Sequence, residues 1–221
     1  MKDRKKLIIA IVAVLIIIVL VGGATFAYWT WVTNTAQQTN VSFVVNQSDL
    51  EGEMYATLEG NGTTTATNLK PATCNGSNAI VKTITIKYLN KTVQAATVSA
   101  TLSVTAFTAR SASYLPSSPN LGYLKYALTT SSSCTSNVQK SGSFSGLTFS
   151  SAVTPTNLPL TLFTQTFTAS ANMSAEGTQT YYLYIWLDSS YEHTNTGSVN
   201  SDPMQGLSFT TQWSGTIAQN S

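Results

Sequence analysis

The side chains that could carry hydrolytic chemistry are few and widely spaced. His193 is the only histidine, so a Ser-His-Asp arrangement could run only through it, with an orienting carboxylate from Asp188, Glu192 or Asp202. The sequence contains neither a G-x-S-x-G nor an H-E-x-x-H motif. We therefore interpret His193 as a solvated loop residue and predict that the protein is not an enzyme and uses no cofactor.

Acidic residues gather in two stretches of the sequence. These stretches are candidate calcium sites, because Ca²⁺ prefers carboxylate and other oxygen ligands. The stretches hold, in order, Asp49, Glu51, Glu53 and Glu59, and then Asp188, Glu192 and Asp202. Neither follows the D-x-[DN]-x-[DN]-G pattern of a calcium loop, and solvated loops are the simpler interpretation. Two cysteines and one histidine cannot supply the four ligands of a structural zinc site. We predict no metal site.

Two tryptophans and two cysteines are the remaining candidates. Trp186 and Trp213 fall on predicted strands, where exposed indoles can stack on sugars, although aromatic residues in strands commonly pack in the core. Cys74 and Cys134 are the only cysteines, and outside the cell such a pair usually forms a disulfide. We predict this bridge, and the alternative is two separate thiols.

The composition of the chain limits the classes of partner. Charged residues make up 9% of the 221 residues, against about a quarter in an ordinary soluble domain. Residues 28–221 contain 34 Thr, 27 Ser and 15 Asn, with seven basic and eight acidic side chains. This near-neutral balance gives no reason to expect nucleic acid as a partner. The abundance of Thr, Ser and Asn favours strands and turns over long helices.

The first 27 residues have the layout of a secretory signal peptide. Residues 1–6 carry a net positive charge, residues 7–21 are an unbroken apolar run, and Gly22-Gly23 ends it. Thr25 and Ala27 are the small residues at −3 and −1 for cleavage by signal peptidase between Ala27 and Tyr28. The alternative is an uncleaved signal anchor in which residues 7–29 span the membrane. Either interpretation places residues 28–221 outside the cytoplasm.

The row KKLIIAIVAVLIIIVLVGGATFAYWTW resembles the SipW-type signal of the TasA/camelysin family, which are secreted matrix proteins of Gram-positive bacteria. The matching residues are Gly22, Gly23, Ala24, Thr25, Phe26, Ala27, Tyr28 and Trp29. The row departs from the family pattern at Trp29-Thr30-Trp31. The resemblance implies a jelly roll and a location in the extracellular matrix or at the cell surface. The proteolysis associated with camelysin is not carried over, because its zinc motif is missing.

Period-two alternation recurs through the body of the chain, and helical periodicity does not. The clearest case is residues 97–106, where apolar and hydroxyl side chains alternate. Residues 181–187 are apolar on both faces, which indicates a central strand covered on two sides. We predict about nine strands, near residues 41–45, 54–58, 80–89, 97–106, 123–128, 143–149, 160–167, 181–187 and 207–217. The pattern predicts an all-β protein in which residues 28–221 form one antiparallel β-sandwich, jelly-roll-like.

Two hypotheses for function follow. The first is a non-catalytic structural protein of the bacterial cell surface or biofilm matrix, which self-associates into fibres. Its strand donor would be residues 28–45, where no charge discourages edge pairing, through Trp29, Trp31, Val41, Phe43 and Val45. The alternative for this segment is pairing of residues 41–45 within their own domain, with residues 28–40 as a tail. The second hypothesis is a surface binding module that recognises glycans or cell-wall polymer through Trp186 and Trp213.

Overall fold

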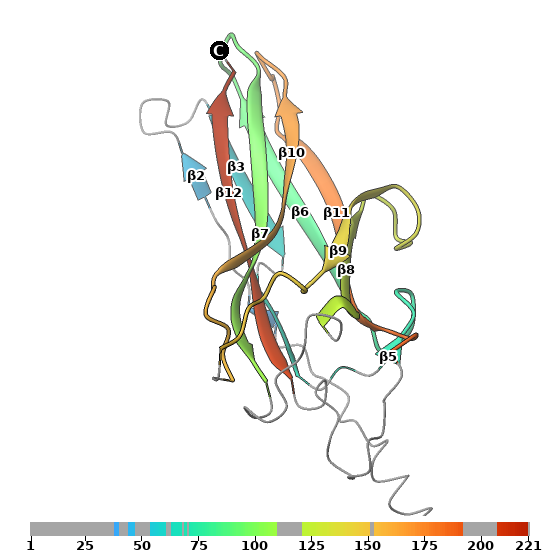
Figure 1. Cartoon of the computed structure of the whole chain (residues 1–221). Helices are drawn as coiled ribbons and strands as arrows, with labels where there is room; N and C mark the ends of the chain where they lie inside the picture. Colours follow the sequence, from blue (N-terminus) through green and yellow to red (C-terminus); the bar gives the residue numbers. More distant parts are fainter. Residues whose placement is uncertain are drawn as a thin grey trace, which may run out of the picture.

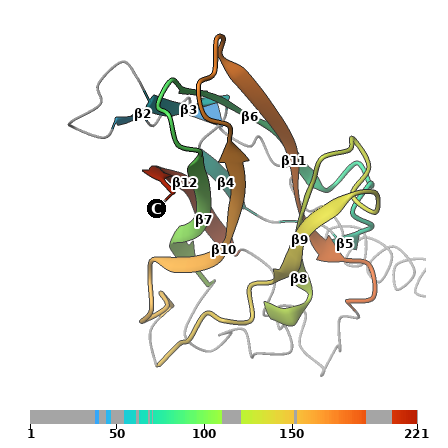
Figure 2. The ribbon, with the colours of Figure 1, turned by 90° about the horizontal axis from the view of Figure 1, so that it is seen from above.

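The fold is a sandwich of two β-sheets. Figure 1 shows it from the side, and Figure 2 shows it from above. The computed structural model describes residues 38–39, 44–46, 54–60, 63–67, 69, 71–109, 121–150, 153–191 and 207–220. Sheet I has the strand order β1-β4-β12-β7-β10, and sheet II has the order β2-β3-β6-β11-β8-β9, with β5 beside β11. The pairing is antiparallel except for the two-residue contact of β5. The predicted all-β sandwich is confirmed.

The described residues form twelve strands, of which nine have five or more residues. Their bounds are β1 Gln38–Thr39, β2 Val44–Asn46, β3 Met54–Gly60, β4 Thr63–Thr67, β5 Pro71–Ala72, β6 Ile80–Asn90, β7 Ala96–Thr108, β8 Leu124–Thr129, β9 Val138–Ser143, β10 Leu160–Ala169, β11 Gly177–Asp188 and β12 Ser208–Gln219. The predicted number of about nine agrees with the nine longer strands.

Eight of these strands have the jelly-roll order, with β4-β12-β7-β10 in one layer and β6-β11-β8-β9 in the other. Most connections therefore pass from one sheet to the other. The hairpin between β8 and β9 is an exception, because both strands lie in sheet II. Adjacent strands are consequently far apart in sequence, and the residues that meet at one place on a sheet come from distant segments.

The core lies between the two sheets and is built by the alternation visible in the sequence. Along β7, the side chains of Ala96, Val98, Ala100, Leu102 and Val104 are each at most 1% exposed. The intervening threonines and serines face outward and bond one another across strands, as Thr101 and Thr164 do at 2.9 Å. A strand with one face buried and one solvated therefore forms where the pattern predicts it.

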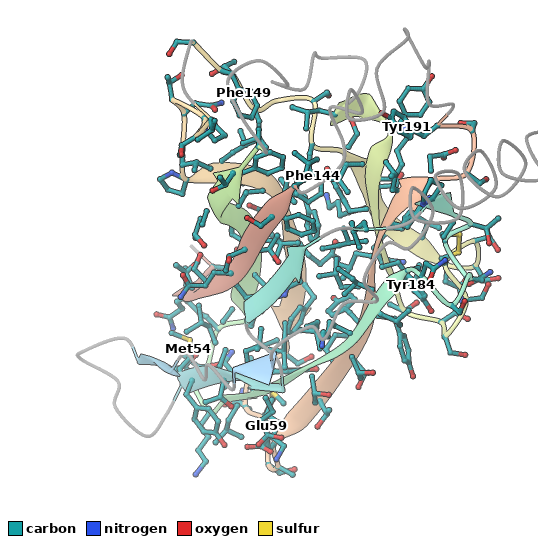
Figure 3. The ribbon with its side chains drawn as sticks, turned by 90° about the horizontal axis from the view of Figure 1, so that it is seen from below. Met54, Glu59, Phe144, Phe149, Tyr184 and Tyr191 are labelled. Atoms are coloured by element: carbon teal, nitrogen blue, oxygen red, sulfur yellow. A yellow bond between two sulfur atoms is a disulfide. The ribbon has the colours of Figure 1, made fainter. Side chains whose placement is uncertain are left out.

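The predicted strand at residues 143–149 is wrong. The strand is β9, Val138–Ser143, whose side chains are exposed apart from the partly exposed Ser143. Phe144 instead begins an irregular segment and is fully buried, with its ring 5.1 Å from that of Phe209 (Figure 3). The apolar residues of this segment are anchors in the core, while β9 exists because its backbone pairs with β8. The spacing of apolar residues in the sequence could not distinguish a segment anchored in the core from a strand that forms through backbone pairing.

One corner between the sheets is built on Asn90, whose side chain is fully buried. Its Oδ1 accepts hydrogen bonds from the Thr92 hydroxyl at 2.7 Å and the Thr92 amide at 3.1 Å. Its Nδ2 donates to the Gln94 carbonyl at 2.8 Å. These bonds satisfy the backbone of the turn that carries the chain from β6 in sheet II to β7 in sheet I.

A glycine opposite a tyrosine sets the packing at the edge of sheet II. Gly142 on β9 pairs with Tyr126 on β8, and a Cβ at position 142 would lie 2.5 Å from Tyr126 Oη. Tyr126 Oη cannot retreat without cost, because it donates a hydrogen bond to the Leu162 carbonyl of β10 at 3.0 Å. The absence of a side chain at Gly142 lets the ring lie across the strand.

We expect Gly142→Ala to lower the free energy of unfolding by about 1–3 kcal/mol, because the new methyl group overpacks the site. Urea denaturation measures the loss. Gly122→Ala is the matched control, since a Cβ at that position meets no atom within 4 Å. Equal stability of the two variants would contradict the close approach of Tyr126.

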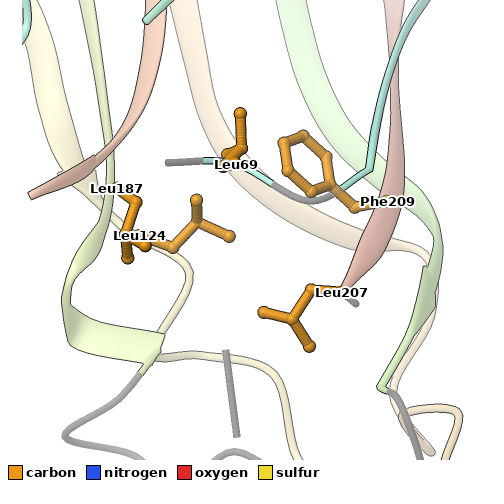
Figure 4. Close-up of a pocket in the computed structure, with 5 residues that line it drawn as sticks. All are labelled: Leu69, Leu124, Leu187, Leu207 and Phe209. Atoms are coloured by element: carbon orange, nitrogen blue, oxygen red, sulfur yellow. The ribbon is translucent and has the colours of Figure 1, made fainter. Parts of the chain in front are cut away.

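A small apolar cavity lies between the sheets at one end of the sandwich (Figure 4). It is lined by Leu69, Leu124, Leu187, Leu207 and Phe209, and its volume is about 10 Å³. That is about the space of one water molecule, and the described side chains that line it are all apolar. These residues form a small packing defect in the core.

Candidate functional site

The outer face of sheet II carries a second, smaller group of aromatic side chains on β11. Tyr181, Leu183, Ile185 and Leu187 belong to the core between the sheets. The alternate residues Tyr182, Tyr184 and Trp186 form a separate cluster with Ala127, Cys74 and Cys134. Tyr184 is only 3% exposed (Figure 3). The prediction of a central strand is therefore confirmed, and its outer face is covered at Tyr184 but only partly at Tyr182 and Trp186.

A disulfide between Cys74 and Cys134 covers this outer cluster, and it confirms the predicted pairing. The two Cα atoms are 6.0 Å apart and 60 residues apart in sequence. Cys74 follows β5, and Cys134 lies in the loop between β8 and β9. The Cys134 amide also donates a hydrogen bond to Asn75 Oδ1 at 3.2 Å. The bridge thus joins two loops that lie over the same face of sheet II.

Beside this cluster is an open hollow of about 310 Å³. Its lining residues come from three neighbouring strands and are Lys125, Tyr126, Ser141, Gly142, Ser143, Trp186 and Asp188. The sheet register explains the grouping, because Trp186 of β11 pairs with Lys125 of β8, and Lys125 pairs with Ser143 of β9. Period-two alternation places Asp188 on the same face as Trp186. The hollow therefore combines one indole, one phenol, one cation, one carboxylate and two serine hydroxyls.

The carboxylate of Asp188 is held in one orientation. Its Oδ1 accepts hydrogen bonds from the Ser190 hydroxyl at 2.6 Å and the Ser190 amide at 2.9 Å. These bonds lower the pKa of Asp188 below its usual value, with further lowering by the Lys125 charge and the Trp186 side chain, against a smaller opposing effect of burial. Asp188 is therefore ionised at neutral pH and is an acceptor of hydrogen bonds.

The groups of the hollow can bind a ligand through hydrogen bonds and apolar contact. A carboxylate with a lowered pKa is a poor general acid or base at neutral pH, because proton transfer is most effective when the pKa lies near the working pH. Lys125 offers three donors, Asp188 offers acceptors, and the serine hydroxyls offer both. The partly buried indole of Trp186 adds an apolar surface with a polar edge.

The structure separates the two tryptophans that the sequence grouped together. Trp186 lines the open hollow, whereas Trp213 on β12 is 3% exposed and lies in the core. The Trp213 ring lies 5.6 Å from that of Phe163 in an edge-to-face arrangement. Its indole offers no exposed face to a sugar, so the possible glycan contact narrows to Trp186.

Several other predicted residues lie outside the described part of the chain. They are the cleavage pair Ala27 and Tyr28, the strand-donor residues Trp29, Trp31, Val41 and Phe43, and also Asp49, Glu51, Glu53, Glu192, His193 and Asp202. Val45 is described only through its backbone, in β2. Glu59 is described and pairs with Lys87 at 2.6 Å.

The described residues contain neither a metal-binding cluster nor a membrane-spanning helix. No group of three or more His, Cys, Asp or Glu in these ranges is placed to hold a metal ion. Within the same ranges there is also no helix with the length and hydropathy needed to cross a bilayer.

The sequence alone did not identify Lys125, Ser141 and Ser143 as site residues. They are separated from Trp186 by more than forty positions, and only the order β11-β8-β9 brings them together. A partial signal was present, because the spacing of Trp186 and Asp188 by two residues puts both on one face of a strand.

No family model, no curated protein and no solved structure matches this chain.

Proposed function

We propose that this protein is a secreted, non-catalytic structural protein of the bacterial cell surface or biofilm matrix, similar to the TasA/camelysin proteins. In this proposal it self-associates into fibres by donating an N-terminal strand to a neighbouring copy. The export leader and the hydroxyl-rich β body support the location. In this proposal signal peptidase removes the leader. If the leader is retained, residues 7–29 provide the only contact with the membrane.

The observation that carries the proposal is the pairing of the two N-terminal strands. Among the strands that the structure describes, β1 pairs only with β4 at the end of sheet I, and β2 pairs only with β3 at the end of sheet II. These contacts involve two and three residues of each strand. So few backbone hydrogen bonds hold an edge strand weakly, and the same segment of another copy can replace it in the same register.

The alternative is that this segment pairs within its own domain. The pairing of Val45 on β2 with Ala56 on β3 is an example of that arrangement. The two arrangements use the same hydrogen bonds and differ only in which copy supplies the strand. Exchange between copies forms an open filament when the rotation between neighbours does not close a ring.

Deletion of residues 28–40 tests the proposal, because it removes β1 and the segment before it. We expect the mature chain beginning at Tyr28 to form filaments at high concentration in electron micrographs, and the truncated chain to remain a folded monomer. A chain with residues 28–40 replaced by a Gly/Ser linker of equal length separates strand pairing from chain length. Equal elongation of the truncated chain, or a full chain that stays monomeric at high concentration, contradicts strand donation.

A second candidate function is a surface binding module that recognises glycans or cell-wall polymer. The hollow beside Trp186 favours it, because this partly exposed indole is accompanied by hydrogen-bond donors and acceptors. The two functions are compatible in one protein, since the hollow on sheet II is formed by β8, β9 and β11 and does not include β1 or β2.

A further inference from the structure

We infer that the hollow formed by Trp186, Lys125, Asp188, Ser141 and Ser143 is a subsite for one neutral hexopyranose unit of a polysaccharide. This inference rests on the second candidate function and names its site and ligand class. The unit lies with its C–H face on the indole of Trp186, and its hydroxyls bond the polar residues around it.

The indole of Trp186 is the first element of the site. One face of a pyranose ring carries mainly C–H groups, and an aromatic ring removes that face from water more effectively than a flexible side chain does. Trp186 packs against the outer cluster with Tyr184 and Cys134, which limits its rotation. The ring is therefore pre-positioned for stacking.

The charges of the hollow select a neutral ligand. Lys125 and Asp188 place one positive and one negative group in the same hollow. Lys125 pairs with Trp186 across β8 and β11, and Asp188 follows Trp186 by two residues on β11. An anionic sugar would meet Asp188, and a cationic sugar would meet Lys125. A neutral diol suits both groups, because one hydroxyl can donate to the carboxylate while its neighbour accepts from the ammonium.

The size and openness of the hollow indicate one unit of a chain rather than an enclosed small molecule. Its volume of about 310 Å³ is at the lower end of the range for ligand sites. β9, which forms its rim, is an edge strand with exposed side chains, so a polymer can continue past it on both sides. The paired strands and the disulfide hold the rim in place before the ligand arrives.

Isothermal titration calorimetry of the mature chain tests the subsite, with hexasaccharides of glucose, N-acetylglucosamine, mannose and galactose as separate probes. We expect saturable binding of at least one hexasaccharide with one site per chain. Trp186→Ala and Lys125→Met each weaken that binding by about tenfold or more, because each removes a central contact. Asp188→Asn, which keeps an acceptor oxygen but loses the charge, weakens it less than Trp186→Ala.

Two matched variants control for the loss of an aromatic ring and of a positive charge. Tyr182→Ala removes another aromatic residue of β11 on the same face but outside the hollow, and Lys91→Met removes an exposed lysine elsewhere. Both should bind like the parent chain, and circular dichroism should show the same fold for all variants.

The outcomes separate the subsite from the wider functions. If the parent chain binds a hexasaccharide and Trp186→Ala binds it equally well, the subsite is wrong but a glycan-binding function survives. If no hexasaccharide binds, both are wrong, and the structural function is judged by filament formation alone. Trp186→Ala should form filaments like the parent chain, because β1 and β2 lie outside the hollow.

Discussion

Replacement of Trp213 by alanine is expected to lower the free energy of unfolding by about 3–5 kcal/mol, which is the usual cost of removing a large aromatic side chain from a core. Trp213 lies on β12 opposite Leu102 of β7 and is 3% exposed. Its ring contacts Phe163 of β10 across the centre of sheet I. The alanine variant leaves a cavity that the paired strands cannot close, because their registers are fixed by backbone hydrogen bonds.

Urea denaturation of the mature chain measures this loss. Trp213→Phe should recover part of the stability, since a ring remains beside Phe163. Trp186→Ala is the matched control on the other sheet and should cost less than about 2 kcal/mol, because that indole is only partly buried. A loss below about 1 kcal/mol for Trp213→Ala would mean that this indole is not a core residue and would restore it as a candidate for glycan contact.

Removal of the Cys74–Cys134 bridge has the second largest expected effect. Closing a loop of 60 residues lowers the entropy of the unfolded chain, which corresponds to about 4 kcal/mol in the loop-closure model. The double variant Cys74→Ser with Cys134→Ser should therefore unfold at a clearly lower urea concentration than the oxidised chain. Both sulfur atoms also belong to the cluster that covers Tyr184, so their loss exposes apolar surface as well.

Two further measurements make the disulfide prediction specific. The parent chain in reducing agent should match the double variant, and hydrogen exchange should rise first in the loops at residues 73–79 and 130–137. Equal stability of the oxidised and reduced chains would contradict a stabilising role. Two alkylatable thiols in protein taken directly from the extracellular fraction would show that the bridge does not form in the secreted protein.

The sequence was sufficient for the long strands whose two faces differ. β7 was predicted from the alternation at residues 97–106, and β12 from that at residues 207–217, because burial of one face imposes a period of two. The central position of β11 in its sheet was also predicted from residues 181–187, which are apolar on both faces, but its neighbours β6 and β8 were not. The disulfide was predictable because the chain has only two cysteines.

The edge strands and the hollow depended on contacts between distant segments. β9 has exposed and mainly polar side chains, so its existence rests on backbone hydrogen bonds to β8, which leave no mark in the residue types. β4, with the hydroxyl-rich sequence TTTAT, pairs through its backbone with β12. Trp186 and Trp213 fall on similar predicted strands. Only the structure distinguishes them, because Trp186 lies on the outer face of sheet II and Trp213 lies in the core between the sheets.

Local spacing thus determined the all-β class and the core strands, and it is consistent with Trp186 and Asp188 on one face of a strand. The order β11-β8-β9 decided that Lys125 and Ser143 stand beside that tryptophan, and the core packing of β12 decided that Trp213 does not face solvent. The physical reason is that alternation records which residues share a face of one strand, whereas the neighbours of that strand are chosen by the packing of the whole sandwich.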